Sequence, residues 1–268
     1  MTRFDQYPAG VPCFVETFSP DLGAARRFYA GIFGWEFDGP GPMPTDGPAE
    51  YWLARARGAE VAGIGSLPSP QTPVAWNTQV AVDDVDASAR LARGAGGTVI
   101  VEPVDAPPAG RLAVVADPTG AAITLWQADA RHGATVVNEP SAWAMSLLTT
   151  PDPQQAAAFY GELFGWRSES FEDAGPGVSL FRRPGYVGGE ESQPVPRDVV
   201  AAMVALPDGD APSAWSVDFW IADARAAADA APGLGGRVIA PPHDAPPFLR
   251  TVLAAPDGAT FTVSELRM

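Results

Sequence analysis

FVETFSPDLGAARRFYAGIFGWEF, residues 14–37, is the stretch that decides the fold, because it returns as MSLLTTPDPQQAAAFYGELFGWRS at residues 145–168. Both copies contain Ser/Thr-Pro-Asp, then alanine-rich spacing, then Phe-Tyr-x-x-x-Phe-Gly-Trp. Agreement at this many positions indicates an internal repeat, which is the first property to establish in an unknown sequence.

Two weaker pairs of segments follow the first pair in the same order along the chain. They are 75–92 with 214–231, and 116–125 with 254–263. Matching order and similar spacing indicate a duplication of about 120–130 residues. The sequence therefore predicts one domain over residues 10–128, a linker over 129–140 and a second domain over 141–266.

Each copy has the pattern of a strand, a helix and further strands. Short apolar runs open the copies, and the Ser/Thr-Pro-Asp triplets predict helix starts, because a hydroxyl caps free N–H groups and proline suits the first turn. Gly34 and Gly165 predict the helix ends. Residues 184–213 are rich in Gly, Pro and Asp and predict a loop, with one apolar strand at 199–206.

Composition excludes several classes of function. The 268 residues carry a formal charge of −15 and no lysine, which argues against nucleic-acid and anionic-membrane partners and rules out lysine Schiff-base chemistry. The single cysteine, Cys13, cannot form an internal disulfide, and no apolar run reaches the roughly 18–20 residues of a membrane span. With no secretory signal at the start, we expect a cytoplasmic protein.

The repeated motif, together with Asp-Pro-x-Gly-Ala at 117–121, resembles the vicinal oxygen chelate superfamily, which includes glyoxalase I, extradiol dioxygenases and bleomycin-binding proteins. The resemblance covers nearly the whole chain twice and is greatest to tandem glyoxalase-like proteins of actinomycetes. It implies an α+β fold of tandem glyoxalase-like domains, each built from paired βαβββ modules that form a cupped mixed sheet. The same fold hosts metal enzymes and binding proteins, so it does not define the function.

The resemblance also implies where a divalent metal would bind, since the superfamily's enzymes use His and Glu side chains on the concave face. None of the aligned residues is a His or a carboxylate, and such sites need several of these ligands together. The residues aligned with the ligand positions are Phe14, Gly63, Asn77 and Thr124 in the first copy, and Met145, Gly188, Ser216 and Thr262 in the second. His132 and His243 lie in predicted loops. We therefore expect no metal and no other cofactor.

Strand alternation from these positions predicts what lines each cup. The candidate ligand-binding residues combine aromatic rings with a few polar groups, as a pocket for a planar drug-sized molecule requires. They are Phe14, Glu16, Phe18, Trp52, Trp76, Asn77, Gln79, Thr124 and Trp126 in the first cup, and Trp143, Met145, Phe181, Trp215, Ser216, Asp218, Trp220 and Thr262 in the second. Tyr51 is an alternative to Trp52, and Trp76, Trp143 and Trp215 are expected at the mouths or edges. The alternative for any one tryptophan is simple core packing.

Glu16 and Asp218 are carboxylates on strands that otherwise carry apolar residues inward. One interpretation is a hydrogen bond to a neighbour such as Arg111; the other is a counter-charge for a cationic ligand, or a general base. Cys13 is expected to point away from Phe14, toward the helix, as a packed thiol.

The sequence thus predicts a metal-free protein that binds an aromatic small molecule, such as an aromatic polyketide antibiotic. It would sequester the drug or assist a biosynthetic tailoring enzyme, with no catalytic residues assigned. The alternative is a metal-independent oxygenase, isomerase or cyclase that acts on a polyketide-like substrate, with Glu16 or Asp218 as the base.

Overall fold

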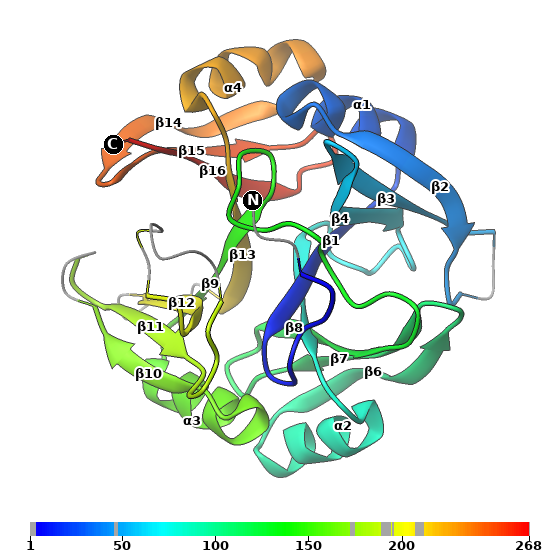
Figure 1. Ribbon diagram of the computed structural model, residues 1–268, viewed down its shortest axis with the longest axis vertical. Coiled ribbons are helices and arrows are strands. Elements are labelled where there is room, and N and C mark those ends of the chain that lie inside the picture. Colours follow the sequence, from blue (N-terminus) through cyan, green and yellow to red (C-terminus); the bar gives the residue numbers. More distant parts are fainter. Residues whose placement is uncertain are drawn as a thin grey trace.

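The computed structural model describes residues 4–45, 48–171, 175–188, 194, 196–206 and 212–267 (Figure 1). Over this part of the chain, two eight-stranded mixed sheets follow one another, and four α-helices accompany them. Both sheets have the same strand order, so the duplication read from the sequence is a duplication of structure.

The first sheet has the order β2-β3-β4-β1-β5-β8-β7-β6. Its strands are β1 (Pro12–Ser19), β2 (Glu36–Pro42), β3 (Glu50–Ala56), β4 (Ala59–Ser66), β5 (Trp76–Ala81), β6 (Thr98–Ala106), β7 (Gly110–Ala116) and β8 (Ala122–Ala128). β1 pairs in parallel with β4, β5 pairs in parallel with β8, and the antiparallel pair β1–β5 joins the two sets of four. Each set is one βαβββ module, as predicted.

The second sheet repeats this order as β10-β11-β12-β9-β13-β16-β15-β14. Its strands are β9 (Trp143–Thr150), β10 (Arg167–Ser170), β11 (Val178–Arg182), β12 (Val199–Ala205), β13 (Ala214–Trp220), β14 (Arg237–Ala245), β15 (Phe248–Ala254) and β16 (Thr260–Leu266). β12 is the apolar strand expected within 184–213; residues 189–193, 195 and 207–211 of that segment lie outside the described residues.

Four helices connect the first and second strands of the modules: α1 (Leu22–Phe33), α2 (Val85–Gly94), α3 (Pro153–Phe164) and α4 (Ala224–Ala230). Asp21 and Asp152 are the N-caps of α1 and α3, and each accepts a hydrogen bond from a backbone N–H of the first turn. The expected hydroxyl caps are therefore wrong: the Ser19 and Thr150 hydroxyls instead accept from the N–H groups of these two aspartates. Gly34 and Gly165 end the helices in the left-handed conformation, as predicted.

The cores beneath the helices combine modules from both halves of the chain. One core joins α1, Trp35 and Trp76 to Phe219 of β13 and Phe261 of β16. A second core joins α2, β5 and β8 to the aromatic residues of α3. In Figure 1, α1 accordingly lies beside α4 and α2 beside α3.

Two tryptophan hydrogen bonds link the halves across these cores. Trp35 Nε1 donates to the carbonyl of Ser141 at 2.8 Å, and Trp166 Nε1 donates to the carbonyl of Gly10 at 2.6 Å. These are the tryptophans of the repeated Phe-Gly-Trp motif, so the motif holds the two copies to each other. In the described part of the chain, no helix is long and apolar enough to cross a membrane.

Candidate functional site

Register places the predicted residues of the first cup in two rows on its concave face. One row contains Phe14, Gln79 and Thr124, whose Cα atoms are cross-strand partners. The next contains Glu16, Gly63 and Asn77. Phe18 and Trp126 continue these faces along β1 and β8 by strand alternation. The structure thus brings together the inward-facing set that alternation indicates in this half.

Side chains of the protein itself fill the first cup. Phe14 is completely buried and Glu16 is only 5% exposed. The Tyr51 hydroxyl donates a 2.6 Å hydrogen bond to Oε2 of Glu16, and burial raises the pKa of this phenol well above its usual value. A Cβ added at Gly63 would lie 1.9 Å from the Tyr51 oxygen, so the phenol occupies the space above this glycine.

Arg131, from the linker between the halves, closes the first cup. Its guanidinium carbon lies 4.4 Å from the ring centre of Phe14 and 4.4 Å from that of Trp126. Trp126 Nε1 donates to the Arg131 carbonyl at 2.9 Å, which fixes the backbone at this point. An arginine between two aromatic rings gains cation–π stabilisation as well as packing.

These residues do not fit the divalent metal that the fold implies. In the first cup, Phe14 is apolar and the Tyr51 phenol covers Gly63. In the second, register with Leu147 identifies Ala202, not Gly188, as the equivalent of Gly63; Gly188 lies in the loop between β11 and β12. Among the described residues no three His, Cys, Asp or Glu side chains gather as a metal site.

The second cup exposes its concave face where the first is filled. At equivalent register positions, buried Phe14 and Glu16 are replaced by partly exposed Met145 and Leu147. Three further positions of this face are also partly exposed: Ala202, Ser216 and Thr262. Since the strand order is the same in both sheets, the difference comes from the side chains that fill the first cup, including Tyr51 and Arg131.

Asp218 lies on the floor of the second cup. Its Oδ2 accepts a 2.7 Å hydrogen bond from the Ser264 hydroxyl and lies 3.8 Å from Nε of Arg250. Its Oδ1 has no hydrogen-bond partner among the described residues. Burial raises the pKa of Asp218 to about 6, while Arg250 and the Ser264 hydrogen bond act in the opposite direction. This carboxyl can therefore hold or release a proton near neutral pH.

Aromatic rings stand at one end of this floor. Trp220 follows Asp218 on the same face, and its ring centre lies 6.0 Å from that of Phe248. The Arg250 guanidinium lies 5.2 Å from the Phe248 ring centre. The second cup thus combines a buried acid, a partly exposed arginine and aromatic walls, which can orient a ligand carrying both polar and planar parts.

Five predicted ligand-binding residues lie on the opposite, helix-covered face. Trp76 Nε1 donates to the Tyr29 hydroxyl at 3.1 Å, and Trp215 Nε1 donates to the Tyr160 hydroxyl at 2.8 Å. Both are buried in the cores under the helices, as are Phe181 and Trp143, the cross-strand partner of Phe219. Trp52 packs under the Arg26 guanidinium, 3.8 Å from its ring centre. Alternation explains this placement, because Trp76 and Trp215 each immediately precede an inward-facing residue.

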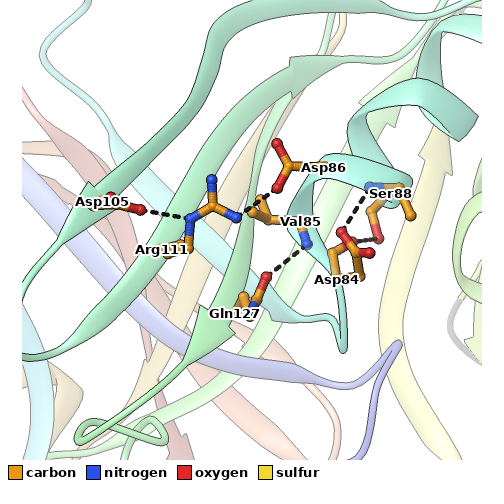
Figure 2. Close-up of polar contacts among 8 residues, drawn as sticks. Asp84, Val85, Asp86, Ser88, Asp105, Arg111 and Gln127 are labelled. Carbon is orange, nitrogen blue, oxygen red and sulfur yellow. Dashed lines mark hydrogen bonds and ion pairs between the residues drawn. The ribbon is translucent and has the colours of Figure 1, made fainter.

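Arg111, the suggested partner of Glu16, pairs elsewhere (Figure 2). It binds Asp105 and Asp86 and so ties α2 to β6 and β7, while Gln127 Oε1 accepts from the Val85 N–H at 2.9 Å. Glu16 is instead paired with Tyr51. The expected side-chain hydrogen bond therefore exists, with a partner that sequence spacing did not indicate.

Cys13 is fully buried and its Sγ lies 3.5 Å from the Gln79 carbonyl oxygen, which it contacts as a weak donor. A β-bulge between Pro12 and Phe14 turns the thiol into the cluster that contains Phe14 and Trp126, so the expected direction toward the helix is wrong. Burial raises its pKa to about 12, which suits a packed thiol rather than a nucleophile. His132 and His243 are both exposed, but His243 lies on β14 and not in the predicted loop.

Sequence reasoning missed Arg131, Arg250 and Phe248. Arg131 comes from a segment without periodicity, so nothing in its pattern indicates an inward position. Arg250 and Phe248 lie on β15, where Arg250 is the cross-strand partner of Ser264. Extending the alternation from Ser264 across this strand pair would have found both.

Paired βαβββ modules, cupped mixed sheets and tandem duplication define a protein of the vicinal oxygen chelate fold. The chain belongs to the family described as glyoxalase-like domain, which matches residues 14–126 and 145–264.

Full-length relatives and a solved structure support this assignment. The CFP32 protein of Mycobacterium tuberculosis, which bears a glyoxylase name, is 38% identical over 269 residues, covering 98% of this chain and 97% of the relative. The anthracycline biosynthesis protein DnrV of Streptomyces peucetius is 30% identical over 281 residues, covering 100% and 96%. The Mn(II)-bound glyoxalase of Novosphingobium aromaticivorans shares the fold, with a TM-score of 0.64, 17% identity and coverage of 99% and 83%.

Proposed function

We propose that this protein binds a small, largely apolar aromatic molecule in the second cup, without a metal ion. The contrast between the cups carries the proposal. Four positions of the concave face are buried in the first cup and partly exposed in the second: Phe14, Glu16, Gly63 and Thr124 are replaced by Met145, Leu147, Ala202 and Thr262. Only the second cup then retains a concave surface for a ligand, and Asp218 lies on its floor with one oxygen unpaired among the described residues.

The proposed ligand class is an aromatic polyketide, in particular one that carries an amine. Asp218 would supply the counter-charge for the amine, and Trp220 and Phe248 would contact the rings. The relative DnrV is named for anthracycline biosynthesis, which supports this class. In the cell, the protein would sequester the compound or assist a tailoring enzyme that makes it, in the cytoplasm and without nucleic-acid or membrane partners.

Apolar burial is sufficient for useful affinity. A multi-ring ligand hides several hundred Å² of apolar surface, and at roughly 25 cal/mol/Å² this exceeds the several kcal/mol lost when the ligand is immobilised. An ion pair with Asp218 then adds selectivity for amines, and amine binding should strengthen as the pH rises through about 6, because Asp218 ionises there.

The test is calorimetric titration of a panel of anthracyclines and angucyclines, with and without an amino sugar, before and after treatment of the protein with a chelator. We expect a Kd in the micromolar range for at least one compound, unchanged by the chelator, and weakened about tenfold by Asp218→Asn for amines only. Asp86→Asn, a surface carboxylate, is the matched control. Absence of any Kd below about 100 μM would overturn the proposal.

A second candidate is a metal-independent enzyme in which Asp218 acts as general base. The observation that favours it is the raised pKa of Asp218, about 6, because a base that titrates near neutral pH is effective in proton transfer. Incubation of chelator-treated protein with the bound compound, followed by mass spectrometry, separates the two. A new product that Asp218→Asn abolishes supports the enzyme, and recovery of unchanged compound supports the binding protein.

A further inference from the structure

Polar residues of the second cup gather on one side of it, on strands β13 to β16. A row of cross-strand partners crosses the concave face there: Trp220, Ser264, Arg250 and His243. Asp218 stands beside this row, two residues before Trp220 on β13. This side of the cup therefore carries both a carboxyl and a guanidinium.

Arg250 has a guanidinium group that the protein leaves largely unused. Its side chain is 41% exposed and that of Asp218 is 13% exposed, so the guanidinium is the more accessible of the two groups. Its Nε lies 3.8 Å from Oδ2 of Asp218, which is too far for a hydrogen bond. Among the described residues the Arg250 side chain makes no closer polar contact.

Phe248 supports this guanidinium from one side. The Arg250 guanidinium carbon lies 5.2 Å from the ring centre of Phe248, within the range of a cation–π contact. Such a contact limits where the guanidinium can move without occupying its N–H groups. Its terminal nitrogens are therefore available to an acceptor that enters the cup.

The first cup has no arginine at the equivalent position. Its residues at these register positions are Gln79, Trp126, Leu112 and Val104, which replace Asp218, Ser264, Arg250 and His243 in that order. The first sheet forms the same strand pairs with a leucine in place of Arg250, so the fold does not require the arginine. The guanidinium belongs to the cup that is partly exposed, where a ligand could reach it.

The other side of the second cup is apolar. Met145 and Leu147 on β9 and Ala202 on β12 are partly exposed on the concave face. A planar aromatic body has its apolar contacts on this side, so its polar substituents point toward Arg250 and Asp218. A guanidinium presents paired N–H donors that match a carboxylate or another anionic oxygen.

We infer that Arg250 determines ligand specificity in the second cup by binding an anionic oxygen group, a carboxylate or an ionised phenol, on the ligand's ring system. This inference rests on the proposed function and refines its ligand class. Asp218 and Arg250 distinguish the substituents of the ligand by charge: an amine is directed to the deeper carboxyl and an acidic oxygen to the more accessible guanidinium. The preferred ligand therefore carries an acidic oxygen, with or without an amine.

The test uses two matched probes, anthraquinone-2-carboxylate and 2-methylanthraquinone, titrated into the full chain by calorimetry. We expect the carboxylate to bind about tenfold more tightly than the methyl compound. Arg250→Gln should remove this preference and leave the affinity for the methyl compound unchanged, which also shows that the variant is folded. Arg225→Gln, an exposed arginine on α4, is the matched control and should keep the preference.

Two further measurements separate a specific contact from general charge attraction. Arg250→Lys keeps the positive charge but loses the paired donors, so it should retain only part of the preference, and it replaces Arg250→Gln if that variant does not fold. Asp218→Asn removes the negative charge beside the guanidinium, so it should strengthen binding of the carboxylate while it weakens binding of amines.

The possible failures are distinguishable. If the two probes bind equally to the wild type, or if Arg250→Gln keeps the preference for the carboxylate, the role of Arg250 is overturned. The proposed function stands in that case if a compound of the polyketide panel binds. If neither probe nor any compound of the panel binds, both are overturned.

Discussion

The Tyr51 phenol donates to the Glu16 carboxylate across the floor of the first cup, directly above Gly63. The phenol covers Gly63, one of the positions that the resemblance aligns with a metal ligand, so the first cup is filled by the protein's own side chains. The second cup has neither residue: Leu147 and Val178 stand at the equivalent register positions.

Gly63→Ala should destabilise the protein by about 1–3 kcal/mol, because the new Cβ would lie 1.9 Å from the Tyr51 oxygen and 3.1 Å from the Phe14 ring. Denaturant unfolding measures the change. The loss should shrink in a Tyr51→Ala background, where the obstructing phenol is absent. Gly94→Ala, with no heavy atom within 4 Å of the new Cβ, is the control. An equal loss in both backgrounds would show that the phenol is not the obstacle.

Asp218→Asn should stabilise the protein more at pH 8 than at pH 5. The folded-state pKa of Asp218, about 6, lies above the ordinary aspartate value of 3.8, so its favourable contribution is complete below about 3.8 and is lost as the pH rises through 6. A shift of this size corresponds to about 3 kcal/mol in total, of which about 1.4 kcal/mol falls between pH 5 and pH 8. Thermal unfolding from pH 5 to pH 8 tests it.

Asp86→Asn is the control for this pH dependence. The hydrogen bond from Arg111 lowers the pKa of Asp86, so its contribution is lost only as the pH falls below the usual aspartate range. The difference between this variant and the wild type should therefore stay constant from pH 5 to pH 8. If the stability difference between Asp218→Asn and the wild type also stayed constant from pH 5 to pH 8, this would contradict the burial of an ionising carboxyl in the second cup.

Arg131→Ala should lower stability by about 1–2 kcal/mol and open the first cup, because it removes the group packed between Phe14 and Trp126. We expect greater quenching of tryptophan fluorescence by acrylamide, as Trp126 becomes accessible. Arg225→Ala, an exposed position on α4, should change neither property. Unchanged quenching would mean that the linker arginine does not close this cup.

Trp76→Phe and Trp215→Phe should reduce stability without changing ligand affinity. Each variant removes a hydrogen bond to a buried tyrosine, Tyr29 or Tyr160, on the helix-covered face. The expected cost is about 1–2 kcal/mol per variant. Calorimetric titration of a bound polyketide measures the affinity. A large loss of affinity in either variant would mean that the ligand binds on the helix-covered face of the sheet, which contradicts our proposal.

The fold could be predicted from the sequence because two signals agreed: the ordered repeat, and the Pro-Asp and Gly residues that mark where the helices begin and end. Alternation also gave the facing of Phe14, Glu16 and Gln79. The misplaced residues have physical causes. The sequence places Trp76 at the mouth of the cup because of its aromatic ring, but strand alternation from the inward-facing Asn77 puts it on the opposite face. The Glu16–Tyr51 pair could not be found, because it depends on the register between β3, β4 and β1, which local patterns do not specify.

Because each core contains residues from both halves, we expect that neither half would be stable if the protein were cut at the linker. A gene that encoded the second half alone would expose Phe219 and Phe261, which now pack against α1, and one that encoded the first half alone would expose Trp35 and Trp76. The two copies therefore form one folding unit. Under the proposed function, the first copy acts as a scaffold that stabilises the second, so the residues of the second cup can change with less loss of overall stability.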